Sequence, residues 1–328
     1  THAASPVELA REVVSASTTL NTGELHFKAD YLNPGKDTSF RVYYNGLDSD
    51  YLTNETYGAE NVWSNGYDAV YHLNEDPGVA GAGEIVDSTG NGNNGSSTGS
   101  MTSADSVSGQ LGSGFDFDGS NDNINLVDFD YDSGPFTISA WARTTSVPGD
   151  MRVVGMYHTG TAQWGIMMDP ADDSVLFGLH DGSNWNTSGN RTKTWDDGNW
   201  MYTVGVVDTS NLTFYVNGVA STSDSHDNAI PVNTKIARIG SLDGASEFFN
   251  GDVDEVRFSG TERSAGWIQT EYYNQSTTTL FYRLDSGTGS TTLANSDAGQ
   301  VNSAFTYQNQ TNEALYAFKL TPETGNAT

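Results

Sequence analysis

The sequence has no cysteine, which excludes disulfide bonds and thiolate chemistry from the fold and from any site. Basic residues are few: 14 Lys plus Arg stand against 42 Asp plus Glu, and the formal net charge is −28. That charge repels the phosphates of nucleic acids and excludes them as natural partners. The sequence also lacks any run of about 18 apolar residues, so we expect no membrane-spanning helix.

Aromatic residues, by contrast, are plentiful. The 328 residues include 7 Trp, 16 Tyr and 14 Phe, although the mean hydropathy is only −0.48. A disordered chain lacks such rings, so a packed core is expected. The excess of acids suits either a surface that stays soluble in salty water or a supply of carboxylates for divalent cations. Both interpretations favour a secreted or cell-surface protein over a cytoplasmic one.

Short runs of alternating apolar and polar residues dominate the chain, and turn residues separate them. Many such strands with little helical periodicity predict an all-β fold, an antiparallel sandwich. One short helix is predicted over 263–275, where Ser264 can cap its start. The clearest predicted strands are 23–32, 38–45, 136–144, 164–169, 174–180, 200–208, 212–218 and 252–259.

The pattern divides the chain into three segments. Residues 1–66 read as a partial N-terminal β domain, and residues 67–275 form the main unit. A polar spacer then leads into residues 276–328, which read as the start of a further β domain or as a strand-exchange segment. We expect both flanks to be parts of larger domains.

Seven motifs occur in one order along the main unit and together resemble the laminin-G-like, concanavalin A-like jelly-roll modules of secreted prokaryotic proteins. The resemblance implies a jelly-roll sandwich over 67–275. The segment before it resembles the tail of an uncharacterised β domain that often precedes such modules. The motifs are AVYHLNE (69–75), DSTGNGNNG (87–95), FDFDGSNDNI (115–124), FTISAWART (136–144), WMYTVGVVDTSNLTFYVNGV (200–219), IARIGS (236–241) and FFNGDVDEVRFSGTERSAGWIQTEYYNQ (248–275).

The stretch 87–95 has two interpretations. Gly and Asn tolerate a left-handed backbone, and Asp and Ser bond their own backbone, which is typical of a surface loop. The same make-up suits a hard cation with oxygen ligands. The resemblance implies a structural Ca²⁺ between this loop and the acidic strand near residue 253, and the alternative is that Asp87 caps its own turn while Asp254 faces water. The predicted ligands are Asp87, Asn91, Asn93, Asp252 and Asp254.

Glycan sites combine flat aromatic rings with amides and acids. Several such residues fall on strands or loops that could line one sheet or its rim. Trp185 is the most suggestive, because it lies in the polar stretch 180–186. For Trp141 and Trp164 simple packing is the favoured alternative, and for Trp185 both interpretations stay open. The candidates are Trp141, Arg143, His158, Trp164, His180, Asp181 and Trp185.

Catalytic signatures are weak. Glycosidases need two carboxylates across a cleft, and the acid-rich strand at 252–258 is assigned by the resemblance to the metal and the fold. Asp172 and Asp173 lie in a predicted turn, and the six His show no zinc-like spacing. We therefore expect no enzyme, with a polysaccharide-cleaving hydrolase as a minor alternative.

The sequence thus predicts a non-catalytic extracellular module for glycan binding or adhesion, stabilised by calcium. The main alternative is a structural subunit or spacer of an extracellular filament or surface layer, which pairs with a neighbouring surface protein or with copies of itself through edge strands. Glycosylation is also possible, since eight Asn-x-Ser/Thr sequons occur, at Asn54, Asn94, Asn186, Asn190, Asn211, Asn274, Asn309 and Asn326.

Overall fold

The chain forms two compact units, one of residues 63–268 and one of residues 1–62 with 269–328. None of the described helices is long and apolar enough to cross a membrane. The computed structural model describes residues 7–17, 22–29, 38–44, 50–79, 81, 83–129, 131, 134–158, 162–171, 174–180, 182–190, 195–226, 235–276, 283–284, 299–305 and 314–320.

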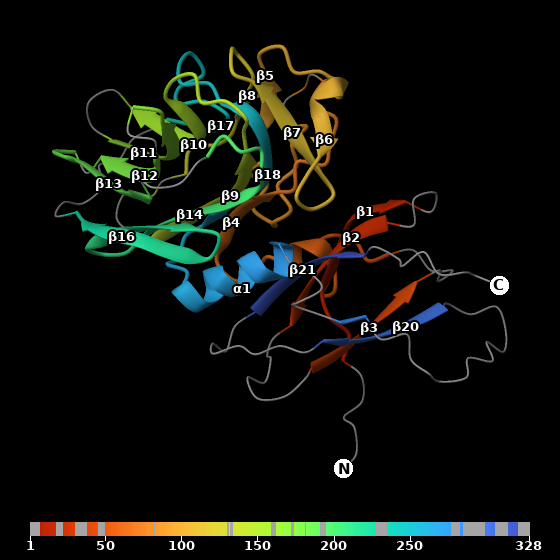
Figure 1. The fold of residues 1–328 in the computed structure, drawn as a ribbon. Coiled ribbons are helices and arrows are strands. Elements are labelled where there is room, and N and C mark those ends of the chain that lie inside the picture. Colours follow the sequence, from red (N-terminus) through yellow and green to blue (C-terminus); the bar gives the residue numbers. More distant parts are fainter. Residues whose placement is uncertain are drawn as a thin grey trace. The chain divides into compact units, whose positions relative to one another are not determined.

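The larger unit contains a seven-stranded sheet in which every neighbouring pair is antiparallel (Figure 1). Its order is β13-β12-β11-β10-β17-β8-β5. The strands are β5 (Ser96–Thr98), β8 (Asn123–Asn125), β10 (Met151–His158), β11 (Ala162–Asp169), β12 (Ser174–His180), β13 (Trp185–Asn190) and β17 (Ala237–Ile239).

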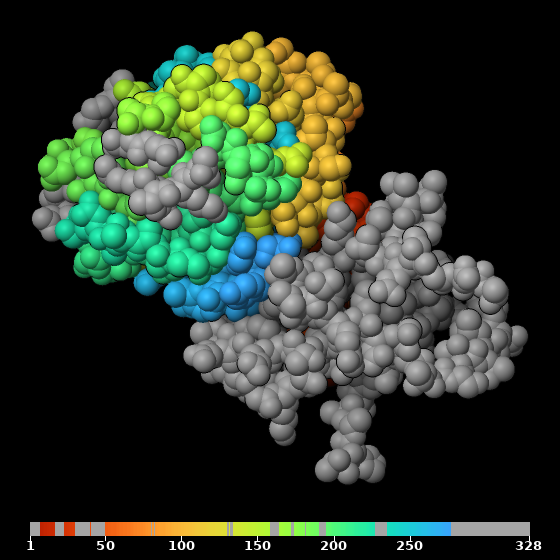
Figure 2. All heavy atoms as spheres, in the orientation of Figure 1, coloured from red at the N-terminus to blue at the C-terminus, as the bar shows by residue number. Residues whose placement is uncertain are grey.

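An eight-stranded antiparallel sheet packs against the first one. Its order is β16-β15-β14-β9-β18-β7-β6, and β4 pairs with β18 beside this path. In Figure 2, β5 to β7 form one end of the larger unit and β13 and β16 the opposite end. The strands are β4 (Tyr67–Tyr71), β6 (Ser106–Ser108), β7 (Ser113–Asp118), β9 (Phe136–Arg143), β14 (Met201–Val207), β15 (Asn211–Val216), β16 (Val219–Ser225) and β18 (Asn250–Ser259).

The core lies between the two sheets and is rich in aromatic rings. Trp164 and Phe177 enter it from the seven-stranded sheet, and Phe136 and Phe258 enter it from the eight-stranded sheet. The Phe136 and Trp164 rings lie 6.2 Å apart, and the Trp164 and Phe258 rings lie 6.0 Å apart. Burial of each such ring stabilises the fold by roughly 1.5 to 3 kcal/mol. The predicted antiparallel β-sandwich is confirmed.

At one side the sandwich is joined across its two sheets. Ser188 of β13 donates through Oγ to the carbonyl of Thr222 in β16 and accepts a hydrogen bond from the Phe214 N–H at 3.0 Å. The N–H of Thr187 also lies 3.3 Å from Oδ2 of Asp224. These bonds anchor β13, although it is the edge strand of its own sheet.

The smaller unit is built from both ends of the chain. One sheet has the order β1-β2-β21, with β1 (Arg11–Ser17), β2 (Thr22–Ala29) and β21 (Ala314–Leu320). The other has the order β19-β20-β3, with β3 (Thr38–Tyr44), β19 (Arg283–Leu284) and β20 (Gly299–Phe305). The pairing of β2 with β21 joins strands nearly 300 residues apart, which local sequence patterns do not reveal.

Three helical segments complete the described structure. The helix α1 (Ala265–Ser276) lies where one was predicted, and the Ile268 N–H donates to the Ser264 carbonyl at its start. The short 3-10 helices are η1 (Ala59–Asn61) and η2 (Ser103–Asp105).

Gly240 tests how tightly the core is packed. It has φ +82°, and a Cβ there would lie 2.4 Å from the Phe117 ring. Gly92 is a matched control, since it has φ +72° and nothing within 4 Å of a Cβ. We expect Gly92→Ala to cost about 1 to 2 kcal/mol for the backbone alone, and Gly240→Ala to cost roughly 1 to 3 kcal/mol more from overpacking, measured by urea unfolding. Equal losses would contradict this.

Candidate functional site

Three glycines lie side by side across the seven-stranded sheet. Gly155 of β10 pairs with Gly165 of β11, which pairs in turn with Gly178 of β12. Their neighbours Val154 and Ile166 are in the core, so the alternation of the strands directs the glycines to the outward face. Because glycine has no side chain, this row is a flat floor on which other groups can lie.

The guanidinium of Arg152 lies above this floor. Arg152 is 4% exposed, and its Nε donates to Oε2 of Glu247 at 2.6 Å. A Cβ on Gly165 would lie 3.4 Å from Nη1, which is buried and has no hydrogen-bond partner among the described residues. A buried polar group without a partner is costly, so Nη1 is a donor that a ligand could satisfy.

Glu247 holds Arg152 through a second contact, since its carbonyl accepts a hydrogen bond from the Arg152 N–H at 3.0 Å. Its own backbone is left-handed, with φ +51°. A residue with a side chain pays roughly 1 to 3 kcal/mol for such a conformation, and such strain is common at functional sites. Contacts around Glu247 therefore offset the free-energy cost of its left-handed backbone. This backbone conformation positions the Glu247 side chain against Arg152.

The indole ring of Trp185 lies next to this pair. A Cβ on Gly178 would be only 2.1 Å from Cζ2 of Trp185, so the ring rests directly on the glycine row. The Cζ atom of Arg152 lies 5.7 Å from the ring centroid, within cation–π distance. Trp185 is 38% exposed. We call Trp185, Arg152, Glu247 and the glycines beneath them the Trp185 platform.

Of the predicted glycan residues that the structure describes, His180 is a direct neighbour of Trp185. The two are directly paired between β12 and β13. His180 accepts a hydrogen bond through Nδ1 from the Gly182 N–H at 3.0 Å, which fixes its ring beside the loop. Asp181 and the side chain of His158 lie outside the described residues.

The remaining candidates lie elsewhere. Trp164 is fully buried in the core, where packing is its role and no glycan can reach it. Trp141 and Arg143 lie on β9 of the other sheet. The Trp141 ring is 1% exposed and lies 5.1 Å from the Tyr202 ring. Arg143 lies 4.7 Å from the Trp200 ring centroid. The glycan candidates that the structure describes therefore do not share one face.

Sequence reasoning missed Arg152, Glu247 and the glycine row. A signal was present, since VVGMYH, WGIMMD and SVLFGLH each carry a glycine inside a strand. An interior glycine weakens a strand and often marks close approach by another group. What the sequence does not show is the register that aligns the three positions.

Asp87, the first predicted calcium ligand, is saturated by the protein itself. Its Oδ1 accepts from the N–H groups of Val70 at 3.1 Å and Thr89 at 2.9 Å. Its Oδ2 accepts from the Thr89 hydroxyl at 2.8 Å and the Asn93 N–H at 2.9 Å. A carboxylate has about four acceptor sites, and all four are used here. Asp87 thus closes its own loop, as in the alternative interpretation, but the other half of that interpretation is wrong, since Asp254 is buried and does not face water.

The two asparagines of the loop also bind the protein. Nδ2 of Asn91 lies 3.1 Å from the carbonyls of both Tyr67 and Asp68, and Nδ2 of Asn93 donates to the Asp68 carbonyl at 2.8 Å. These amides cover carbonyl groups at the start of β4. The loop is held by donors directed at backbone oxygens, which is the opposite of a cage of oxygens around a cation.

Asp252 and Asp254 are likewise engaged. Oδ2 of Asp252 accepts from Nε of Arg143 at 2.5 Å, and Oδ2 of Asp254 accepts from the Leu111 N–H at 2.9 Å. In the described part of the chain, neither these two nor Asp87 belongs to a group of three or more Asp, Glu, His or Cys with ligand atoms within 4.8 Å of one another. The five predicted residues do not fit a calcium ion in this arrangement.

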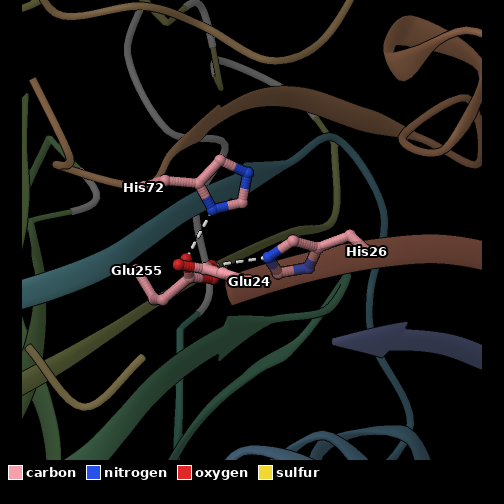
Figure 3. Close-up of side chains that lie close together, drawn as sticks. All are labelled: Glu24, His26, His72 and Glu255. Carbon is pink, nitrogen blue, oxygen red and sulfur yellow. Dashed lines mark hydrogen bonds and ion pairs between the residues drawn. The ribbon is translucent and has the colours of Figure 1, made fainter. Parts of the chain in front are cut away.

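Paired charges also occur at β18. Glu255 has φ +50° and hydrogen-bonds Nδ1 of His72 (Figure 3). It also accepts a hydrogen bond from Nη2 of Arg257. In the smaller unit, Nε2 of His26 lies 2.7 Å from Oε1 of Glu24, also drawn in Figure 3. Within each unit, then, a carboxylate has a basic partner.

Asp116 and Asp252 face each other across β7 and β18 on the outward face of the eight-stranded sheet. Burial raises the pKa of Asp116 to about 6, and a hydrogen bond to Asp252 and the charges of Asp252, Asp105 and Asp122 add to the effect. The pair therefore holds a proton in mildly acidic solution.

Asp87→Ala tests what closes the loop. Removing the carboxylate leaves buried donors without partners, so we expect a loss of at least about 2 kcal/mol in the free energy of unfolding. The loss should be equal in EDTA and in millimolar calcium. A melting temperature that falls on chelation in the intact protein, but not in the variant, would contradict this and favour the calcium hypothesis.

Asp116→Asn tests the acid pair. The folded pKa of Asp116 is raised above its ordinary value of 3.8, so its stabilising contribution is present below that value and is lost as pH rises through about 6. Asparagine mimics the protonated form, so the variant should melt higher than the wild type at pH 8 and equally at pH 3.5. Asp196→Asn, at an exposed position, controls for removal of one charge. A gain in stability that is independent of pH would contradict this.

In sequence, residues 118–269 match the model of a family described as the concanavalin A-like lectin/glucanases superfamily (Laminin_G_3). A comparison with curated proteins gives no match. The sequence match falls on the larger unit and includes β10 to β13, which carry the Trp185 platform.

Solved structures share this fold at low identity. Domain 4 of AbnA, a GH43 extracellular arabinanase from Geobacillus stearothermophilus, in complex with arabinotriose, is 18% identical with a TM-score of 0.52, and the match covers 62% of this chain and 97% of that one. The botulinum neurotoxin serotype G binding domain is 15% identical with a TM-score of 0.51, covering 66% and 53%. The binding domain of Paraclostridial Mosquitocidal Protein 1 is 17% identical with a TM-score of 0.50, covering 66% and 54%.

The chain spans about half the length of the two toxin binding domains and nearly all of the arabinanase domain. At these identities the likeness shows the fold alone. Together with the sequence match over residues 118–269, it confirms the predicted resemblance to concanavalin A-like jelly rolls over that part of the chain.

Proposed function

We propose that the protein is a non-catalytic extracellular module that binds glycan through the Trp185 platform on the outward face of the seven-stranded sheet. One observation carries the proposal. A half-exposed indole ring lies beside a buried guanidinium that has an unused donor, and both lie on a floor of glycines.

Each part of the platform suits a sugar. The Trp185 ring offers a flat apolar surface to the C–H face of a pyranose or furanose, and apolar area removed from water contributes about 25 cal/mol per Å². Nη1 of Arg152 supplies a donor for a hydroxyl or ring oxygen, and Glu247 supplies a carboxylate that can accept. The Glu247 contact fixes the guanidinium in advance, which lowers the entropy lost on binding.

Nη1 is buried in this conformation, so a hydroxyl group reaches it only after a neighbouring side chain moves, and the proposal assigns that movement to Trp185, whose ring lies 5.7 Å from Cζ of Arg152. The position of Trp185 at the start of an edge strand favours such a rotation. The Ser188 bonds to the other sheet keep the strand itself in place. In this proposal the Trp185 side chain moves while the backbone of β13 stays fixed.

The comparisons support a binding role by analogy of fold. The arabinanase domain is in complex with arabinotriose, and the toxin domains are binding domains. Fold alone does not fix function, so the proposal rests on the platform rather than on this likeness.

Hydrolysis is disfavoured at the acid pair of the other sheet. Asp116 and Asp252 hydrogen-bond each other, whereas the two carboxyl groups of a glycosidase lie about 5 Å apart or more. Calcium has no part in the proposed binding, because Asp87 already has four donors.

Trp185→Ala tests the platform in the full chain. Losing the ring removes roughly 1 to 3 kcal/mol of binding, or about fivefold to 150-fold in Kd, for a glycan found by array screening and measured by calorimetry. The melting temperature should stay nearly unchanged, because the ring is partly exposed.

Trp200→Ala is the matched control, since Trp200 also stacks with an arginine but lies at the other sheet. It should leave the affinity unchanged. The proposal fails if no glycan binds the intact protein, and filaments formed by such a protein would favour the structural alternative. Equal losses from both variants would place the site away from Trp185.

A further inference from the structure

The Trp185 platform is bordered by two more acids. Asp150 directly precedes β10 and Asp169 ends β11, and Met151 pairs with Met168, so the two aspartates are neighbours across the strands. Asp150 is exposed. The register therefore places both carboxylates at the end of β10 that carries Arg152.

Electrostatics agree with this placement. Partial desolvation of the carboxylate, followed by the charges of Asp169 and Glu247, raises the pKa of Asp150, while Arg152 lowers it. Three charged groups thus act on Asp150: the carboxylates of Asp169 and Glu247 and the guanidinium of Arg152. Glu247 compensates Arg152 through its direct contact, and the charges of Asp150 and Asp169 remain. Among the described residues, this end of the platform is negative.

Resting on the proposed function, we infer that the glycan is an uncharged saccharide and that Asp150 and Asp169 determine this specificity by repelling acidic sugars. The unused donor on Arg152 calls for an acceptor, which a hydroxyl or ring oxygen supplies as well as a carboxylate does. Asp150 and Asp169 distinguish a neutral sugar from an acidic one, because their negative charges repel a carboxylate or sulfate placed close to them.

The guanidinium by itself does not attract an anion. Its Nε is already bound to Glu247, which cancels its charge at longer range. The net charge of −28 adds a weak repulsion that salt screens beyond about 8 Å at physiological ionic strength. The short-range repulsion from Asp150 and Asp169 is therefore the larger effect.

The experiment compares matched ligands and matched variants of the full chain. A neutral oligosaccharide that binds is tested against its form oxidised at C6 to the uronic acid and against its O-sulfated form, by calorimetry at low and high salt. The variant is Asp150→Asn with Asp169→Asn, and the control is Asp128→Asn with Glu262→Gln, two exposed acids elsewhere in the larger unit.

The wild type and the control should bind both acidic forms about fivefold to tenfold more weakly than the neutral one, with a smaller difference at high salt. The double aspartate variant should bind the neutral form unchanged and lose most of the discrimination. If the variant discriminates as the wild type does, or if the wild type prefers an acidic form, the inference is wrong and glycan binding stands. If no saccharide binds in any arm, both proposals fail.

Discussion

The packing of aromatic rings between two antiparallel sheets determines nearly everything else in the larger unit. Trp164 and Phe177 from one sheet meet Phe136 and Phe258 from the other, and their burial fixes which face of each strand turns inward. Because side chains alternate along a strand, the inward residues dictate the outward ones. The glycine row is outward for this reason, and a shift of one residue in any strand would bury it.

The Trp185 platform on the outward face consists of groups that would each destabilise the fold if they occurred alone. An interior glycine weakens a strand, a left-handed glutamate is strained, and a buried guanidinium is costly unless paired. Here the three are combined: the glycines make room, Glu247 pairs with Arg152, and the Trp185 ring lies beside them. Local departures from structural rules that coincide at one place are typical of a functional site.

The loop at Asp87 shows how the same residue types can serve two kinds of structure. Acids and asparagines in a glycine-rich turn can surround a cation with oxygens, or they can accept and donate hydrogen bonds within the chain. In this protein the Asp87 carboxylate receives four donors, and the amides of Asn91 and Asn93 reach backbone carbonyls. The direction in which each amide points distinguishes the two, and a sequence does not carry that direction.

The sequence by itself determined the fold class, since alternation in FTISAWAR or SVLFGLH requires a strand with one face in a core. It also singled out Trp185, because a large ring in a polar stretch has no core to fill. It did not determine that Trp164 is buried while Trp185 is partly exposed, because alternation does not say which face is inward. Tertiary structure alone decided the pairing of β2 with β21, the alignment of Gly155, Gly165 and Gly178, and the meeting of Arg152 with Glu247. Each of these depends on register and on contacts between distant residues, which are set by the packing of the whole chain.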